Sequence, residues 1–242
     1  MTRTTAGSHA VMMAAVAVWV TALAGCGGDD GLGIGPPSAG QLGQVTAQPE
    51  CGALNQACLS SGLDVPIATG SKLGLGINFN VSGSSGPPAG LESTSPEILT
   101  IEDGVLTGIA PGLSGVLVTG PNGEVIDFIH VWVRDAAELR LIRHNDIGQP
   151  LGTVRDEATL LVGDEILISV EALTANQALL GLFKVDWTAE LIEGDAEGVE
   201  PVSVVPDLVF GWYRLVARAP GTVRLTVEAL EQSKTLELEV LP

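Results

Sequence analysis

The chain has 242 residues, with 29 Asp and Glu against 11 Lys and Arg, and a formal net charge of −18 at pH 7. A surface this acidic argues against nucleic-acid binding, which needs clustered Lys and Arg, and against attachment to anionic lipid by charge. The charge therefore excludes these partners, but it identifies no ligand.

Residues 1–25 have the pattern of a signal peptide. Arg3 is their only charged residue, and residues 10–23 form an apolar run too short for an ordinary membrane span. The tetrapeptide that follows, Leu23-Ala24-Gly25-Cys26, resembles the lipobox of bacterial lipoproteins. This resemblance implies that Cys26 is diacylated, with palmitate-type chains, and becomes the first residue after cleavage. The alternative is an ordinary secretory signal with Cys26 as a free thiol.

Residues 26–50 read as a flexible, disordered tether, because Gly, Pro, Ser, Gln and Asp dominate them and no regular apolar period is present. A phosphate-binding loop at residues 31–35 is rejected, since no Lys-Ser/Thr step follows and no strand precedes it. Gly27 directly after Cys26 resembles the pattern sorted to the outer membrane in some bacteria with two membranes. We therefore expect a lipid-anchored cell-envelope protein, and favour the outer over the inner membrane.

Cys51 and Cys58 lie seven positions apart, and in an exported protein this pair is expected to form a disulfide. The chain-entropy estimate for such a short loop is on the order of 2–3 kcal/mol. A redox role is disfavoured, because there is no Cys-x-x-Cys spacing and no expected helix start beside the thiols. A metal needs more than two thiol ligands, so no cofactor is predicted.

Two copies of one pattern organise the rest of the chain. Ala110-Pro111-Gly112 recurs as Ala219-Pro220-Gly221, a separation of 219 − 110 = 109 residues. Each copy leads into a strand with alternating apolar residues, then a hairpin turn, then a last strand at residues 125–133 or 235–241. A repeat of this length indicates two copies of a domain. The predicted fold class is all-β.

These residues resemble the C-terminal half of the bacterial immunoglobulin-like domain of group 2, a β-sandwich of about seven strands. The family's Gly-x-Val-Thr-Gly-x-Ala-Pro-Gly-Thr run is matched by residues 104–112 and less fully by residues 217–222. The family's central Trp is matched by Trp187, which we expect in the core, but Leu91 stands there in the first copy.

The resemblance covers roughly residues 65–242. It implies two tandem immunoglobulin-like β-sandwiches, at residues 51–135 and 136–242, and such domains serve as spacers and as adhesive or binding modules. The connector at residues 134–137 is short, so we expect the domains to sit end to end with restricted hinge freedom. Residues 174–182 are the exception to the all-β prediction, because their composition favours a helical turn or a short helix, with an inserted corner as the alternative.

An apolar outer face is predicted on the first domain. If the Ile and Val residues of the strand at 125–133 face the core, Phe128, His130 and Trp132 must face outward, with Leu117 beside them on the neighbouring strand. The aligned positions of the second domain carry Arg, Thr and Glu. An exposed apolar patch on one copy alone indicates a binding face for a protein or a polysaccharide. The alternatives are that Trp132 packs against the second domain, or that the register is shifted by one.

No catalytic group is predicted, so we expect no enzyme. His130 lies in a strand without an acidic partner at a suitable spacing. His144, beside Asp146, lies on a predicted turn and is expected to be exposed to solvent. An envelope hydrolase would need clustered His and carboxylates that the sequence does not predict.

The acidic loop at residues 193–200 carries Glu193, Asp195 and Glu197 among small residues. It is a weak candidate for calcium, and a solvated acidic turn is the favoured interpretation. The predicted function is a lipid-anchored, non-catalytic binding or adhesion module, held to a membrane by its N-terminal lipid. The alternative is a structural spacer without a specific ligand.

Overall fold

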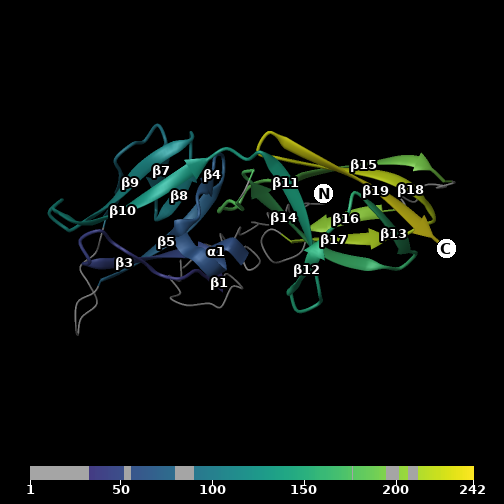
Figure 1. Cartoon of the computed structure of the whole chain (residues 1–242), viewed down its shortest axis with the longest axis horizontal. Helices are drawn as coiled ribbons and strands as arrows, with labels where there is room; N and C mark the ends of the chain where they lie inside the picture. The colour runs from purple at the N-terminus through teal and green to yellow at the C-terminus, as the bar shows by residue number, and fades with distance from the viewer. Residues whose placement is uncertain (1–32, 52–55, 80–89, 176, 195–201, 207–211) are drawn as a thin grey trace, which may run out of the picture. The chain divides into compact units, whose positions relative to one another are not determined.

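The structure is a computed structural model, which describes residues 33–51, 56–79, 90–175, 177–194, 202–206 and 212–242. Residues 31–242 form one compact unit. In the described ranges this unit consists of β-strands with one short helix, α1 (Gln56–Ser61), and one 3-10 turn, η1 (Gly62–Asp64). The all-β fold class is confirmed (Figure 1). None of the described helices is long and apolar enough to cross a membrane.

The first sandwich is formed by strands β1 (Gly33–Ile34), β2 (Ser38–Ala39), β3 (Val45–Cys51), β4 (Ile67–Ala68), β5 (Lys72–Phe79), β6 (Gly90–Ser93), β7 (Leu99–Glu102), β8 (Val105–Gly108), β9 (Gly112–Thr119) and β10 (Val125–Arg134). One sheet has the order β1-β3-β5-β8-β7, with β2 also paired to β3. The facing sheet has the order β4-β10-β9-β6.

The second sandwich is formed by β11 (Glu138–His144), β12 (Pro150–Thr153), β13 (Glu157–Leu161), β14 (Glu165–Leu173), β15 (Asp186–Glu193), β16 (Val202–Pro206), β17 (Trp212–Ala217), β18 (Gly221–Ala229) and β19 (Gln232–Leu241). Its sheets have the orders β12-β11-β14-β17-β16 and β13-β19-β18-β15.

The two sandwiches share one topology. The order β3-β5-β8-β7 in the first corresponds to β11-β14-β17-β16 in the second, and β4-β10-β9-β6 corresponds to β13-β19-β18-β15. In each case the first strand joins one sheet, and the short strand after it pairs in parallel with the last strand of the other sheet. Four strands facing four in this order make the sandwich of immunoglobulin-like domains. Besides these eight shared strands, the described residues of the first sandwich form β1 and β2, and those of the second form β12.

The alternation of buried and exposed side chains along the strands shows where the core lies. Along β10 the side chains of Ile129, Val131 and Val133 are buried, and those of His130 and Trp132 between them are exposed. In β19 every second residue from Leu236 to Val240 is likewise buried. One face of β10 and one face of β19 therefore pack against the opposite sheet, and the hydrophobic effect of that burial holds the layers together.

The structure corrects the extent of the tether. The predicted tether ended at residue 50, but β3 pairs with β5 from Val45 to Glu50, and Val45 and Ala47 are fully buried. The alternation of Val45 and Ala47 with polar residues is a strand pattern that the Gly and Pro content of the segment obscured. The first domain therefore begins before Cys51, and β1 and β2 extend its sheet further toward the N-terminus.

The predicted helix at residues 174–182 is wrong over its described residues. Ala178 forms an isolated bridge with Leu173, Leu180 with Ile67, and Leu182 with Lys72, so this segment is extended. Tertiary pairing overrides the weak helix propensity of its Ala, Asn, Gln and Leu residues.

This extended segment joins the two sandwiches. The Ala68 amide donates to the Leu180 carbonyl at 2.9 Å, and the Leu180 amide donates to the Pro66 carbonyl at 2.8 Å. Leu180 is fully buried among the core residues of the first sandwich, although it lies in the sequence of the second. Gly181 permits the close approach, because it has a positive φ and a Cβ there would collide with the side chain of Ser71. The two sandwiches are thus joined by more than the short linker. We call the insertion of Leu180 into the first core, with its backbone hydrogen bonds to Pro66 and Ala68, the interlock.

Candidate functional site

The outer face of β9 and β10 collects the apolar residues that the sequence singled out. The two strands pair antiparallel, with Phe128 opposite Leu117 and Trp132 opposite Leu113. Directly opposite residues on one face of a sheet lie side by side, so these pairs form one strip along the two strands. We call this strip, made of Leu113, Leu117, Phe128, His130 and Trp132, the aromatic strip.

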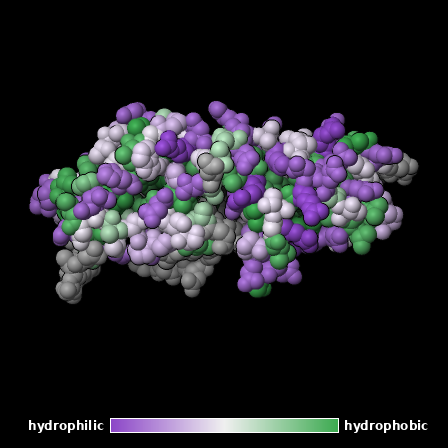
Figure 2. Space-filling model, viewed as in Figure 1, coloured by the Kyte–Doolittle hydropathy of each residue, from purple (hydrophilic) through white to green (hydrophobic). Residues whose placement is uncertain are grey.

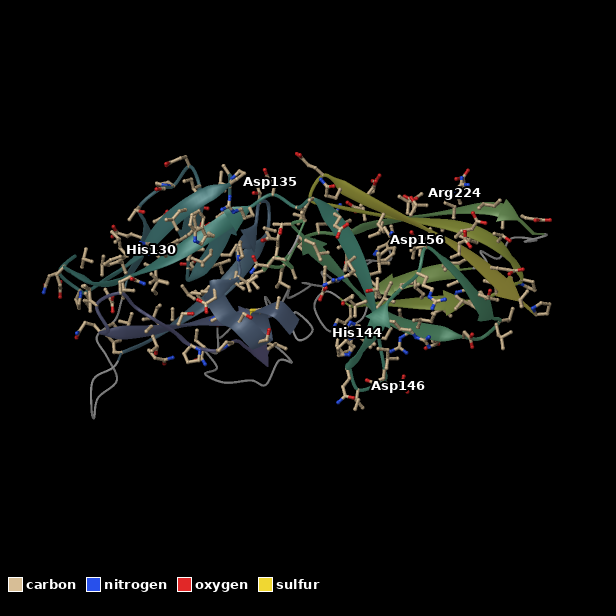
Figure 3. The ribbon with its side chains drawn as sticks, viewed as in Figure 1. His130, Asp135, His144, Asp146, Asp156 and Arg224 are labelled. Atoms are coloured by element: carbon tan, nitrogen blue, oxygen red, sulfur yellow. A yellow bond between two sulfur atoms is a disulfide. The ribbon has the colours of Figure 1, made fainter. Side chains whose placement is uncertain are left out.

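The aromatic strip reaches solvent. Trp132 is 43% exposed and Leu113 38% exposed, His130 is exposed, and Phe128 and Leu117 are half-buried. Figure 2 shows hydrophobic side chains at the surface in the region of β9 and β10, and Figure 3 labels His130 on β10. The predicted outward orientation of these side chains therefore agrees with the register, and the use of this face for binding stays a prediction.

Side-chain contacts near both ends of the aromatic strip restrict the orientation of its rings. The Phe128 and His130 rings meet edge to face, with their centroids 5.5 Å apart. The guanidinium of Arg134 lies over the indole of Trp132, 4.9 Å from the ring centroid. An exposed cation–π contact of this kind contributes about 0.5–1 kcal/mol, enough to favour one orientation of the indole. The orientation of the Trp132 ring is therefore partly fixed by Arg134.

The second sandwich offers an internal comparison. Gly112 pairs with Val133 in the first sandwich, and Gly221 pairs with Val240 in the second, so the registers correspond. By this correspondence the pair Trp132–Leu113 is replaced by Glu239–Thr222, His130–Gly115 by Glu237–Arg224, and Phe128–Leu117 by Thr235–Thr226.

The fold itself therefore does not require an apolar outer face. The second sandwich builds the same sheet with charged and hydroxyl side chains at the same places, including the exposed ion pair of Arg224 with Glu190 at 3.4 Å. Arg224 is labelled on this sheet in Figure 3. Exposed aromatic residues add solvent-accessible apolar surface that folding does not need, and such surface indicates a contact with another molecule.

A buried carboxylate that the sequence pattern did not predict, Asp127, lies next to the strip. Asp127 is fully buried, and its carboxylate accepts hydrogen bonds from the backbone amides of Leu42 at 2.8 Å, Gln44 at 2.7 Å and Val45 at 3.1 Å. The Phe128 amide adds a fourth, at 2.8 Å. Its inward place in the alternation of β10, where Ile and Val otherwise stand, was the signal that could have found it.

Asp127 stays ionised in this setting. Burial alone would raise the pKa of the Asp127 carboxyl, but the amides of Leu42, Phe128, Gln44 and Val45 together lower that pKa below its ordinary value. The carboxylate thus fixes the segment that enters β3 to the strand that carries the aromatic strip. We call this arrangement the Asp127 clamp.

His144 corrects a second expectation, because it is not a solvated turn residue. It is only 4% exposed at the end of β11, its ring stacks on Trp212 with centroids 5.7 Å apart, and its Nε2 lies 2.8 Å from the Ser169 hydroxyl. Nδ1 lies 3.1 Å from the Gly148 carbonyl. The pairing of β11 with β14 brings Ser169 alongside, a contact between residues 25 positions apart that turn composition does not reveal.

The buried pair of His144 and Ser169 serves packing. Burial lowers the pKa of His144, against the opposing effects of the Gly148 carbonyl and the Glu171 carboxylate. The ring is therefore neutral at pH 7, and Nδ1 donates to Gly148 while Nε2 accepts from Ser169. Ser169 is itself only 5% exposed, so its hydroxyl offers no access to a substrate. His130 lies on the other sandwich, so the two histidines do not meet (Figure 3).

The remaining predicted site residues divide into three groups. The disulfide between Cys51 and Cys58 is confirmed, with a Cα–Cα distance of 5.6 Å. Glu193 is exposed at the end of β15, whereas the other two candidate calcium ligands, Asp195 and Glu197, lie outside the described residues, as does Cys26. In the part of the chain that the structure describes, no group of three or more His, Cys, Asp or Glu is arranged to hold a metal.

No protein-family model matches the sequence, and a search of curated proteins found no match. Among solved structures, the chain is similar to domains 4 and 5 of the S-layer protein SbsC, with 17% identity and a TM-score of 0.29 over 74% of this chain and 93% of that chain. It is similar to the Yersinia pseudotuberculosis adhesin InvE, with 13% identity and a TM-score of 0.31 over 74% of this chain and 57% of that chain. It is also similar to the Escherichia coli adhesin FdeC, with 14% identity and a TM-score of 0.32 over 86% of this chain and 65% of that chain. At these values the likeness carries no information on function, which has to come from the chain's own surface.

Proposed function

We propose that this protein is a non-catalytic binding module of the bacterial cell envelope, which holds a protein or polysaccharide on the aromatic strip. The observation that carries the proposal is the 43% exposure of Trp132 on a sheet face that the sister sandwich builds with Glu239 instead. Trp is the residue most often found as the anchor of a binding surface, since it offers a large rigid ring. Arg134 and the flanking apolar residues surround this anchor.

The N-terminal sequence supports attachment to a membrane. The tetrapeptide ending in Cys26 has the lipobox pattern, and Gly27 favours delivery to the outer membrane where there are two. Two or more acyl chains hold a protein stably at a bilayer, since each buried methylene contributes about 0.8 kcal/mol. The acidic surface then keeps the folded part away from anionic lipid.

Crosslinking at a single position tests the binding face. A photoreactive benzoylphenylalanine replaces Leu113, which lies opposite Trp132, in one variant and Thr222, its counterpart in the second sandwich, in the other. We expect one discrete crosslinked species from position 113 in intact cells and none from position 222. Equal background from both positions would contradict the proposal and favour the spacer.

Two substitutions at corresponding positions measure how much Trp132 contributes to the affinity for the partner. Once the crosslinked partner is purified, Trp132→Ala is expected to weaken binding by about 2 kcal/mol, roughly 30-fold, as for a central anchor. Glu239→Ala serves as the matched control and should leave the affinity unchanged. A Trp132→Ala effect below about threefold would show that the strip is not the contact surface.

Metabolic labelling tests the anchor separately. An alkyne analogue of palmitate should label the wild-type protein and leave Cys26→Ala unlabelled and released from membranes. Labelling that persists in Cys26→Ala would refute the lipid anchor without touching the binding face.

A structural spacer is the second candidate, and the interlock favours it. Backbone hydrogen bonds join Lys72 and Leu182 in both directions, at 2.9 and 2.6 Å, in addition to those of Leu180. These bonds and the buried Leu180 resist bending between the sandwiches, which a stalk needs. A spacer does not account for the exposed Trp132, so we place it second.

A further inference from the structure

We propose that copies of this protein associate head to tail, with the second sandwich of one copy docked end-on against the first sandwich of the next. We call the end at which the last strand of a sandwich stops, β10 or β19, its exit end. The opposite end, with the hairpin turn before that strand, is its entry end. The contact involves neither the aromatic strip nor Thr222, whose side chains lie on the outer faces of the sheets.

The junction within one chain shows what docks on an exit end. At the exit end of the first sandwich, Ala68 is fully buried and belongs to the core of the second sandwich. A Cβ on Gly70 would lie 3.3 Å from the side chain of Leu230, which is in the turn between β18 and β19. The exit end of the first sandwich is thus covered by the entry end of the second.

The register identifies the same positions at the exit end of the second sandwich. Arg134 pairs with Ala68 at the end of the first sandwich, and Leu241 pairs with Leu161 at the end of the second. Leu161 therefore takes the place of Ala68, yet it is 54% exposed. The same position of the fold is buried at one exit end and open to solvent at the other.

The open exit end carries more apolar side chains than the covered one. Leu241 stands where the first sandwich has Arg134, and Val162 stands where it has Thr69. The last residues of β15 lie at the same end, because β15 pairs antiparallel with the start of β18. We call the five large aliphatic side chains at this end, which are between 39% and 54% exposed, the exit patch: Leu161, Val162, Leu191, Ile192 and Leu241.

The exit patch is an apolar surface that the fold does not require, since the first sandwich builds the same positions with smaller or charged residues. Figure 2 shows hydrophobic side chains at this end of the second sandwich, where β15 stops and the C-terminus is marked in Figure 1. Several exposed aliphatic side chains at one end of a domain indicate a contact with another molecule. The chain's own junction indicates that this molecule is the entry end of another sandwich.

Asp164 determines the kind of contact that the exit patch can make. Its carboxylate accepts a hydrogen bond from the Leu161 amide at 2.9 Å, whereas the corresponding Ala68 amide donates to the Leu180 carbonyl. The Leu161 amide is therefore already satisfied, and the interlock is not repeated there. A partner meets the aliphatic side chains of the patch instead, so the contact is reversible.

The entry end of the first sandwich supplies the complementary surface. The second sandwich docks within the chain through the turn between its last two strands, and the corresponding turn of the first sandwich joins β9 to β10. Pro121 in this turn and Val125 next to it are exposed. The exposed Leu42 lies beside them, because its amide bonds to Asp127 on β10. We call Leu42, Pro121 and Val125 the entry patch.

Burial of aliphatic side chains favours this association, and the formal net charge of −18 opposes it, because two copies repel each other. Patches of five and three side chains are small beside the roughly 20–30 residues per side of a stable interface. We therefore expect weak association, with Kd on the order of 100 μM. Salt screens the repulsion, so higher salt should strengthen the contact.

Sedimentation equilibrium of residues 27–242, which contain every described strand, measures the association. A head-to-tail contact leaves one free patch at each end of the assembly, so growth should continue past the dimer. At about 0.5 mM protein and about 0.5 M sodium chloride, the weight-average mass should exceed twice that of one copy. It should be lower at about 0.05 M salt.

Two variants separate the two ends without a change in net charge. Leu161→Gln with Leu241→Gln alters the exit patch, and Leu42→Gln with Val125→Gln alters the entry patch. Each variant alone should stay monomeric at about 0.5 mM. An equal mixture of the two should form dimers and nothing larger, because one intact exit patch meets one intact entry patch. Unchanged melting temperatures show that the variants fold.

The matched control replaces two exposed aliphatic residues elsewhere on the second sandwich. Ile147→Gln with Leu151→Gln alters the hairpin that contains β12 and should associate like the wild type.

Four results would overturn the proposal. The first is a wild-type protein that stays monomeric at about 0.5 mM in high salt. The second is association that stops at a dimer, which would indicate a symmetric contact between identical ends. The third is a variant mixture that stays monomeric, and the fourth is a control that loses association as the exit variant does. None of these results bears on the binding function of the aromatic strip.

Discussion

Removing the carboxylate of Asp127 should unfold the entry to the first sandwich. The carboxylate accepts four backbone amides, those of Leu42, Gln44, Val45 and Phe128, and Val45 is fully buried. A net hydrogen bond to a charged group contributes about 1.5–3 kcal/mol, and a buried amide left without an acceptor costs about 1–3 kcal/mol. We therefore expect Asp127→Ala to lower the free energy of unfolding by about 3–5 kcal/mol.

The pH dependence of stability provides a second, independent test of the role of Asp127. Because the folded state holds the pKa of Asp127 below its ordinary value of 3.8, the ionised group stabilises the fold above that pH. This contribution is lost as the pH falls from about 3.8 through the lower pKa of the folded state. Wild-type stability should thus decline in this acidic range more steeply than that of Asp127→Asn, which keeps the shape and cannot ionise.

Urea denaturation with amide hydrogen exchange is the assay. The Gln44 and Val45 amides should lose protection in Asp127→Ala, and Asp135→Asn, an exposed carboxylate on the same chain (Figure 3), is the matched control. A loss of stability below about 1 kcal/mol in Asp127→Ala, or the same acid slope in wild type and Asp127→Asn, would refute the reasoning.

Three further predictions concern stability alone. Leu180→Ala should lower the free energy of unfolding by about 2–5 kcal/mol, since it leaves a cavity in the core of the neighbouring sandwich. Calorimetry should then show two separate melting transitions, and one unchanged transition would contradict the interlock. Glu231 is exposed with φ of 62° in the β18–β19 turn, so Glu231→Gly should stabilise by about 0.5–1 kcal/mol, and a lower melting temperature would show that the turn is not strained. Reduction of the Cys51–Cys58 disulfide should cost about 2–3 kcal/mol, measured by urea denaturation with and without dithiothreitol; equal midpoints would show that the bond adds no stability.

The outward orientation of the aromatic strip could be predicted from the local sequence pattern. Trp132 and His130 face outward because side chains alternate along any strand, and this holds whatever the opposite sheet contains. The same reasoning assigned the buried face of β10, and the repeated Ala-Pro-Gly turns aligned β9 with β18. Both depend on residues close in sequence, and the structure agrees with them.

The missed features depend on residues far apart in sequence. Asp127 finds its amide partners 82 to 85 positions earlier, and Ser71 donates to the Leu180 carbonyl across 109 positions. His144 was expected in solvent because its neighbours favour a turn, yet β14 and β17 supply the surfaces that bury it. The sequence of β3 predicts a tether, because its short alternation of buried and exposed residues follows a segment rich in Gly and Pro.

The sequence by itself determined the all-β class, the duplication, the disulfide and the outward direction of the aromatic strip. The duplication follows from the recurrence of one pattern 109 residues along the chain. The other three follow from spacing within one strand or one short loop, where the chain itself sets the geometry. Only the tertiary structure decided that the Asp127 clamp holds the N-terminal strand, that Leu180 enters the neighbouring core, and that His144 is buried against Trp212. These features depend on which distant segments of the chain pack together. Local periodicity shows which face of a strand is apolar, but it does not show which other segment will pack against that face.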